Sequence, residues 1–328
     1  MKLHVFLLLS AMVICPLLAE DEKDPTVAAW KVAALKAQEE KKNSKYADAA
    51  ESAKQALRLA KHFAPLDAKL GSTYHLLGII YRDWGHCAES RTSYKHAIAI
   101  WLQLPRPNPR YIFNSITSLV SVECECDDFA AAEKTFRAYQ PELQRFRSNS
   151  LDDAQLLSLE AVLARGRKDY ARSEALFRQS IEMMEKSPDV QPVELAVQRS
   201  SLSVVLEQEG RHAESLAESE RAIAFLEHAA PLHHSLLAAI NNAACSLAEI
   251  GRREESERMF ERALALAAQM YGEENRVTAK IMLSYARVLG ENKESPAAAD
   301  FRKKGIEAFR SALRRDNGTV DVEDLRKK

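Results

Sequence analysis

The residues that could carry chemistry in this 328-residue chain are few, and the cysteines are the most distinctive of them. Cys124 and Cys126 flank Glu125 in a C-x-C sequence, a spacing that occurs in redox and metal-binding elements but indicates neither strongly. The nine histidines are scattered, and the pair His233-His234 is interpreted as part of a polar turn rather than as a metal site. The sequence contains no phosphate-binding loop, dinucleotide-binding glycine pattern, nucleophile elbow or His-Glu-x-x-His motif. It therefore predicts a protein that is not an enzyme and that holds no cofactor or metal.

The overall charge is nearly balanced, which bears on the class of partner. The chain has 46 Lys and Arg residues against 47 Asp and Glu residues, a formal net charge of −1. Such a balance offers no basic footprint for nucleic acid or for an anionic membrane surface. Hydrophobic residues make up 46% of the chain, enough for a sizeable core. The partner we expect is a protein or a peptide.

The first 19 residues resemble a secretory signal. Lys2 precedes an almost wholly apolar run, and Ala19 comes directly before a charged stretch. The run is shorter than the roughly 20 residues that span a bilayer, and no later segment is long and apolar enough to do so. We expect cleavage after Ala19 and a secreted or periplasmic protein. A lipoprotein that uses Cys15 is the disfavoured alternative.

A repeat runs through most of the chain. When Gly71 is counted as position 1, large residues fall at positions 4, 7 and 11, glycines at 8 and 15, small residues at 20 and 27, and an aromatic residue at 24. The template recurs every 41 or 42 residues, and its first position falls at Trp30, Gly71, Phe113, Ala154, Ala196, Leu237 and Ala279. Self-similarity at such a period is typical of stacked helical units.

Packing explains the pattern. Two antiparallel helices approach closely only where one side chain is small, and position 20 is always alanine or serine. The aromatic residue at position 24 fills the space beside it. Most prolines fall where one unit ends and the next begins, as expected because proline cannot continue a helix. Pro141 is the exception, and it predicts a kink or an early end in the second helix of the third unit.

These features resemble the tetratricopeptide repeat, and the long period is similar to the kinesin-light-chain type of array. The segments 240–244 (Ile-Asn-Asn-Ala-Ala) and 260–264 (Phe-Glu-Arg-Ala-Leu) carry this likeness most clearly. The resemblance implies an all-α, right-handed superhelical solenoid of about seven helix-turn-helix repeats over residues 30–315. Residues 20–29 would lead into it, and residues 316–328 would form a polar, disordered tail.

The resemblance indicates the fold strongly and the function weakly. It implies a non-enzymatic scaffold that binds a peptide segment or a partner domain in its concave groove. The alternative is an accessory subunit of an enzyme or of an envelope-assembly complex, with a redox or metal element at Cys124 and Cys126.

Positions 2, 5, 9 and 12 of each first helix share one face because their spacings are three or four residues. The resemblance places this face on the concave surface, and its charged members are six basic residues and one acidic residue. We therefore predict an acidic or carboxylate-bearing peptide, with Arg82 and Arg165 as the main contacts. A groove filled by the protein's own tail or by water is the alternative. The predicted groove comprises Lys31, Ser72, His75, Arg82, Asn114, Thr117, Ser121, Gln155, Ser158, Arg165, Ser200, Asn241 and Arg287.

Two cysteines are candidates for a disulfide. Cys87 falls at the start of one second helix and Cys126 at the end of the next first helix, so stacking places them at the same end of the layer. A bridging distance is then plausible, and an oxidising compartment favours the bond. The alternative, that all the cysteines of the mature chain are reduced, remains equally open. Cys245 is not expected to pair in either case.

Overall fold

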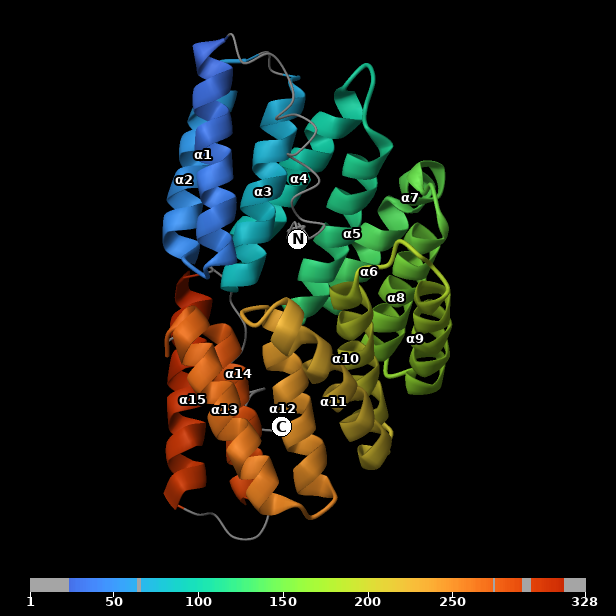
Figure 1. Cartoon of the computed structure of the whole chain (residues 1–328), viewed down its shortest axis with the longest axis vertical. Helices are drawn as coiled ribbons and strands as arrows, with labels where there is room; N and C mark the ends of the chain where they lie inside the picture. The colour runs from blue at the N-terminus through green and yellow to red at the C-terminus, as the bar shows by residue number, and fades with distance from the viewer. Residues whose placement is uncertain (1–23, 64–65, 274, 291–295, 316–328) are drawn as a thin grey trace, which may run out of the picture. The chain divides into compact units, whose positions relative to one another are not determined.

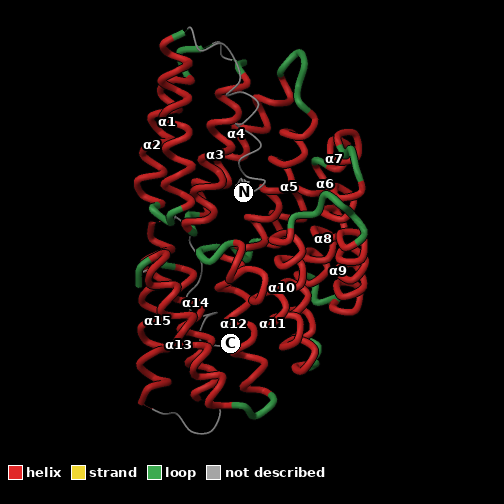
Figure 2. The backbone as a smooth tube through the Cα atoms, in the orientation of Figure 1, coloured by secondary structure: helices red, strands yellow, loops and turns green. Residues whose placement is uncertain are grey.

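The computed structural model of the chain describes residues 24–63, 66–273, 275–290 and 296–315, and all regular structure in these ranges is helical (Figures 1 and 2). The expected signal (1–19) and the expected tail (316–328) lie outside the described residues. None of the described helices has the length and apolar character that a membrane span needs.

The helices form seven pairs that follow the sequence repeat. Each first helix packs on the second helix of its own pair. The pairs are α1 (Pro25–Lys42) with α2 (Tyr46–Ala60), α3 (Ala68–Trp84) with α4 (Cys87–Gln103), α5 (Pro109–Glu125) with α6 (Phe129–Ala138) and α7 (Gln140–Phe146), α8 (Ser150–Gly166) with α9 (Tyr170–Glu185), α10 (Pro192–Gln208) with α11 (His212–Ala229), α12 (His234–Glu249) with α13 (Arg253–Tyr271), and α14 (Arg276–Gly290) with α15 (Pro296–Arg315).

The third pair contains the predicted break. Its second helix ends at Ala138, and a short new helix begins at Gln140, so that Pro141 lies in the first turn of α7. Proline there removes a backbone donor and its ring would clash with the preceding turn of a continuous helix. The prediction made from Pro141 is confirmed.

The contacts divide the chain into two compact units, Met1–Ser148 and Asn149–Lys328. The first, called here the N-terminal unit, contains α1 to α7. The second, the C-terminal unit, contains α8 to α15. The boundary between them falls in the turn that follows α7.

The small residue at position 20 also makes a hydrogen bond. Four units have serine at position 20, and in each of them the serine hydroxyl donates to the backbone carbonyl at position 8 of the first helix. The hydroxyl thereby replaces water as the carbonyl's additional partner at the closest point of the helix pair. The bonds are Ser90 to Gly78 (2.8 Å), Ser173 to Ala161 (2.8 Å), Ser215 to Ser203 (2.8 Å) and Ser256 to Ala244 (2.7 Å).

The aromatic residue at position 24 explains the glycine at position 8 of the second repeat. Tyr94 is fully buried, and its ring lies so close to Gly78 that a Cβ atom added there would come within 2.8 Å of it. Phe177 and Phe260 are also fully buried at the same position in their repeats. These aromatic rings therefore serve the core and are not available to a ligand.

The turn between the two helices has the same backbone conformation in six repeats. Gly85, Gly210 and Gly251 at position 15 have φ angles of 81°, 74° and 83°, as expected for a glycine that ends a helix. The equivalent residues of the other three repeats also lie in the left-handed region, although they carry side chains. They are Ser44 (57°), Asp127 (64°) and Lys168 (62°).

Candidate functional site

The residues at positions 2, 5, 9 and 12 of the first helices are called here the first-helix face. In the N-terminal unit, fewer of these side chains are exposed than the sequence predicted. Ser72, His75 and Thr117 are all buried. The Nδ1 atom of His75 lies 2.8 Å from the Ser115 hydroxyl, and burial lowers the pKa of His75 to about 3. The imidazole is therefore neutral at physiological pH and packs inside the protein. Of the predicted groove residues in this unit, the partly exposed ones are Lys31, Arg82, Asn114 and Ser121.

Arg82 already has carboxylate neighbours within the protein. Its Nε atom lies 3.4 Å from Oδ1 of Asp83 and 3.8 Å from Oε2 of Glu125, and the Lys41 ammonium lies 3.0 Å from Oδ2 of Asp83. Burial favours a lower pKa for Arg82, but Glu125 and Asp83 outweigh it and raise the pKa above its ordinary value. Two basic and two acidic side chains thus balance in this cluster.

Sequence reasoning missed these partners although a signal was present. Lys41 and Arg82 occupy position 12 of their repeats, and Asp83 and Glu125 occupy position 13 of the repeats that follow. A base at one position facing an acid one repeat later predicts an ion pair between neighbouring first helices. The prediction considered positions 2, 5, 9 and 12 of each first helix and left out position 13.

In the C-terminal unit, the predicted groove residues Ser158 and Ser200 are buried as well. The hydroxyl oxygens of Ser158 and Ser180 lie 2.7 Å apart, and they lie 3.0 and 2.8 Å from the backbone carbonyl oxygen of Ala154. Ser200 is 5% exposed, and its backbone carbonyl accepts a hydrogen bond from the side-chain amide of Asn242. The partly or fully exposed predicted residues of this unit are Gln155, Arg165, Asn241 and Arg287.

The paired asparagines of α12 behave differently from one another. The side-chain amide of Asn242 donates to the Ser200 carbonyl (3.2 Å) and to the Ser203 hydroxyl (3.1 Å), which ties α12 to α10. The side-chain oxygen of Asn241 is shielded from solvent and accepts no hydrogen bond from the protein. Because buried polar atoms are normally satisfied, this oxygen differs from the Asn242 amide in that no donor of the described structure satisfies it.

Polar side chains surround the end of the same face. Glu207 lies 3.1 Å from the His212 ring and accepts a 2.8 Å hydrogen bond from Ser246, while Arg287 pairs with Glu249 at 3.0 Å. Cys245 is buried, and that burial raises the pKa of its thiol to about 11. Its thiol is therefore protonated at neutral pH and is a poor nucleophile.

The two cysteines of the C-x-C sequence have different roles in the structure. Cys126 is joined to Cys87 in a disulfide whose Cα atoms lie 6.2 Å apart, which connects the end of α5 to the start of α4. Cys124 is buried. In the parts of the chain that the structure describes, no group of three His, Cys, Asp or Glu side chains is arranged to hold a metal ion.

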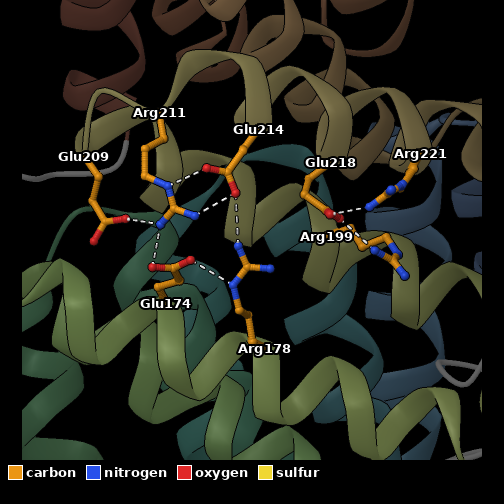
Figure 3. A network of polar contacts seen from close by, with 8 residues as sticks. All are labelled: Glu174, Arg178, Arg199, Glu209, Arg211, Glu214, Glu218 and Arg221. Carbon is orange, nitrogen blue, oxygen red and sulfur yellow. Dashed lines mark hydrogen bonds and ion pairs between the residues drawn. The ribbon is translucent and has the colours of Figure 1, made fainter.

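A network of ion pairs joins the second helices α9 and α11 (Figure 3). Arg211, at the start of α11, lies within 3.2 Å of carboxylate oxygens of Glu174, Glu209 and Glu214. The hydrogen bonds that Arg211 donates, first to Glu214 and then to Glu174, raise the pKa of Arg211. Arg178 bridges Glu174 and Glu214 from the other side (2.8 and 3.5 Å).

A second group of charges connects α10 to both neighbours, and Figure 3 shows the part of it that joins α10 to α11. Arg199 occupies position 4, where most repeats have an apolar residue, and lies 2.7 Å from Glu218. It also pairs with Glu185, while Glu218 pairs with Arg221 at 2.6 Å. Every charge drawn has an opposite charge beside it, so the network links repeats and leaves no unmatched group for a substrate.

The repeating helix pairs, with small residues where they cross and a left-handed turn between them, are matched by one family model. The model described as tetratricopeptide repeat matches residues 236–276, which contain α12 and α13. Residues 236–276 thus match the tetratricopeptide repeat, and the other described helix pairs follow the same template. No curated protein matches it in sequence.

Solved structures with a similar fold cover most of this chain. A Rap protein complexed with Competence and Sporulation Factor is 11% identical, with a TM-score of 0.67 over 92% of this chain and 81% of that one. NprR in complex with its cognate peptide NprX is 11% identical, with a TM-score of 0.61 over 97% and 90%. The Rap conjugation gene regulator of plasmid pLS20, in complex with the Phr* peptide, is 12% identical, with a TM-score of 0.67 over 94% and 86%. At these identities the likeness concerns the fold.

Proposed function

We propose that this protein is a non-enzymatic scaffold that binds an extended peptide segment of a partner on the first-helix face of its C-terminal unit. The observation that carries the proposal is the shielded side-chain oxygen of Asn241, which has no hydrogen bond within the protein. A backbone N–H of an extended peptide that displaces the atoms covering this oxygen would supply the donor that the oxygen lacks. Solved proteins of the same fold are described as complexes with peptides, which supports this class of ligand.

The charges of this face favour a peptide that bears carboxylates. At positions 2, 5, 9 and 12 of the four first helices, the basic members are Arg165, Lys280 and Arg287, and the acidic member is Glu207. Arginine pairs well with carboxylates because its guanidinium presents two parallel donors. In the N-terminal unit, Asp83 and Glu125 offset the basic side chains, and in the C-terminal unit Glu249 pairs with Arg287 at 3.0 Å.

We further propose that the protein works outside the cytoplasm. The signal-like residues 1–19 motivate this proposal, and a disulfide between Cys87 and Cys126 supports it because such bonds persist in oxidising compartments. Sequencing the N-terminus of exported protein is the test. An N-terminus at Glu20 is expected, and Met1 retained on cytosolic protein would contradict the proposal.

Peptide binding can be tested without knowing the partner. A peptide-display library is selected against the full chain, and the affinity of the selected peptides is measured by fluorescence anisotropy. We expect Asn241→Ala to weaken binding about tenfold, since one hydrogen bond contributes about 1 to 1.5 kcal/mol. The double variant Arg165→Glu/Arg287→Glu should weaken carboxylate-bearing peptides further, most visibly at low salt.

The control is Gln269→Ala, which removes an exposed side chain of α13. It should bind the selected peptides as the unchanged protein does. If no peptide is selected, or if all of these variants fold and bind equally well, the first-helix face is not the binding surface.

A further inference from the structure

The helix α15 is strongly basic, although the net charge of the whole chain is close to zero. α15 contains six basic residues and two acidic ones, whereas the complete chain has a net charge of −1. Arg302, Lys303, Lys304 and Arg314 are exposed, and Arg310 is partly exposed. Along a helix, Arg302 and Arg314 are separated by about 18 Å, so the charge extends over three turns.

The opposite side of α15 is used in packing. Ala308, Phe309 and Ala312 are buried, and the Arg276 guanidinium of α14 lies 5.1 Å from the centre of the Phe309 ring. Gly305 is buried as well, and a Cβ atom there would come within 3.0 Å of Leu283. Because α15 is anchored in this way, its charged side has a defined orientation.

The acidic residues of the helix offset only part of this charge. Lys304 forms an ion pair with Asp300 at 2.8 Å, and this pair raises the pKa of Lys304. Glu307 is the other acidic residue, and it is exposed. Four positive charges remain in excess on one helix.

We propose that the exposed basic face of α15, formed by Arg302, Lys303, Lys304, Arg310 and Arg314, docks an acidic segment of a partner protein. The surface is distinct from the first-helix face discussed above and does not depend on peptide binding there. Several charges on one ordered helix attract a segment of opposite charge and increase its rate of association.

Two other anionic surfaces fit this face less well. A helix that lies on a membrane inserts large apolar side chains, and α15 has none among its exposed, described side chains. Proteins that bind single-stranded nucleic acid combine basic grooves with exposed aromatic side chains on which bases stack. The aromatic residues of α15 are the partly buried Phe301 and the buried Phe309, so a carboxylate-rich polypeptide is the better match.

The test uses the full chain and a fluorescent polyglutamate peptide as the probe. We expect binding that weakens steeply as salt is raised from about 50 to 300 mM, because the contacts are exposed ion pairs. The variant Lys303→Glu/Lys304→Glu should lose at least tenfold in affinity at low salt. The matched control is Arg258→Glu/Arg262→Glu, which changes the net charge equally but on the exposed side of α13, and it should change affinity less than threefold.

Three outcomes would overturn the proposal. One is an equal loss in the α13 control, which would mean that only overall charge matters. Another is tighter binding of duplex DNA or of anionic phosphatidylglycerol vesicles than of polyglutamate, with the same dependence on Lys303 and Lys304. The third is a marked gain in polyglutamate affinity when Asp321, Glu323 and Asp324 are replaced by their amides, which would identify the chain's own C-terminus as the occupant.

Discussion

Breaking the disulfide between Cys87 and Cys126 should destabilise the N-terminal unit by up to about 4 kcal/mol. The two cysteines are 39 residues apart, so the bond closes a loop of that size in the unfolded chain. Loop-closure entropy for this length is about 13 cal/mol/K, which corresponds to about 4 kcal/mol at 25 °C. Since small domains have unfolding free energies of about 5 to 15 kcal/mol, the loss would be a large part of the total.

The measurement can be confined to this unit. All three tryptophans, Trp30, Trp84 and Trp101, lie in it, so urea denaturation followed by tryptophan fluorescence reports on this unit alone. The double variant Cys87→Ala/Cys126→Ala should unfold at lower urea than the unchanged protein and should not respond to reductant.

Cys245→Ala is the control, because its thiol lies in the C-terminal unit. It should leave the tryptophan-detected transition unchanged and still sensitive to reductant. If peptide mapping shows the bond present but reduction changes the unfolding free energy by less than about 1 kcal/mol, the loop-entropy reasoning is wrong.

Two further predictions concern buried residues of the same unit. Gly78→Ala should lower the free energy of unfolding by about 1 to 3 kcal/mol, because the added methyl group would come within 2.8 Å of the Tyr94 ring. The matched variant Gly290→Ala should be neutral or slightly stabilising, because the nearest atom to its methyl group is the flexible end of an arginine at 3.4 Å. Urea denaturation followed by circular dichroism compares the two variants. The folded-state pKa of His75 is about 3 against about 6.5 when unfolded, so the unfolded chain binds the proton first and stability falls as pH drops between these values. Lowering the pH from 6.5 to 5 should therefore remove about 2 kcal/mol, and His75→Asn should flatten this part of the pH profile; an unchanged slope would show that His75 is not buried in its neutral form.

Much of the fold was predictable because its signals are local or strictly periodic. The small residue at position 20, the aromatic residue at 24 and the turn glycines each have a direct steric meaning, so they predicted the seven helix pairs. Pro141 predicted the break between α6 and α7 for the same reason. The period of 41 or 42 residues also placed Cys87 and Cys126 at the same end of neighbouring helices.

The candidate site was predictable only in outline. Helical spacing grouped the residues of each first helix on one predicted face, but it does not say how closely the next helix packs. His75 and Ser158 carry polar groups suited to a ligand, yet neighbouring helices bury both of them. Asn241 and Asn242 are adjacent and chemically identical, and only the position of α10 decides that one is satisfied and the other is not.

The repeat, the helix pairs and the residues that pack where helices cross could therefore be read from the amino-acid pattern, because they follow from short-range sterics and periodicity. The stacking of the helices decided which of the charges that the repeat places opposite one another come within ion-pair distance. Lys41 pairs with Asp83, which lies 42 residues later in the sequence, and this ion pair depends on the stacking of α1 and α3. The tertiary structure also decided the conformation of Ser44, Asp127 and Lys168, which adopt a left-handed backbone that side chains disfavour. The packing of helices on both sides of each turn outweighs that local preference.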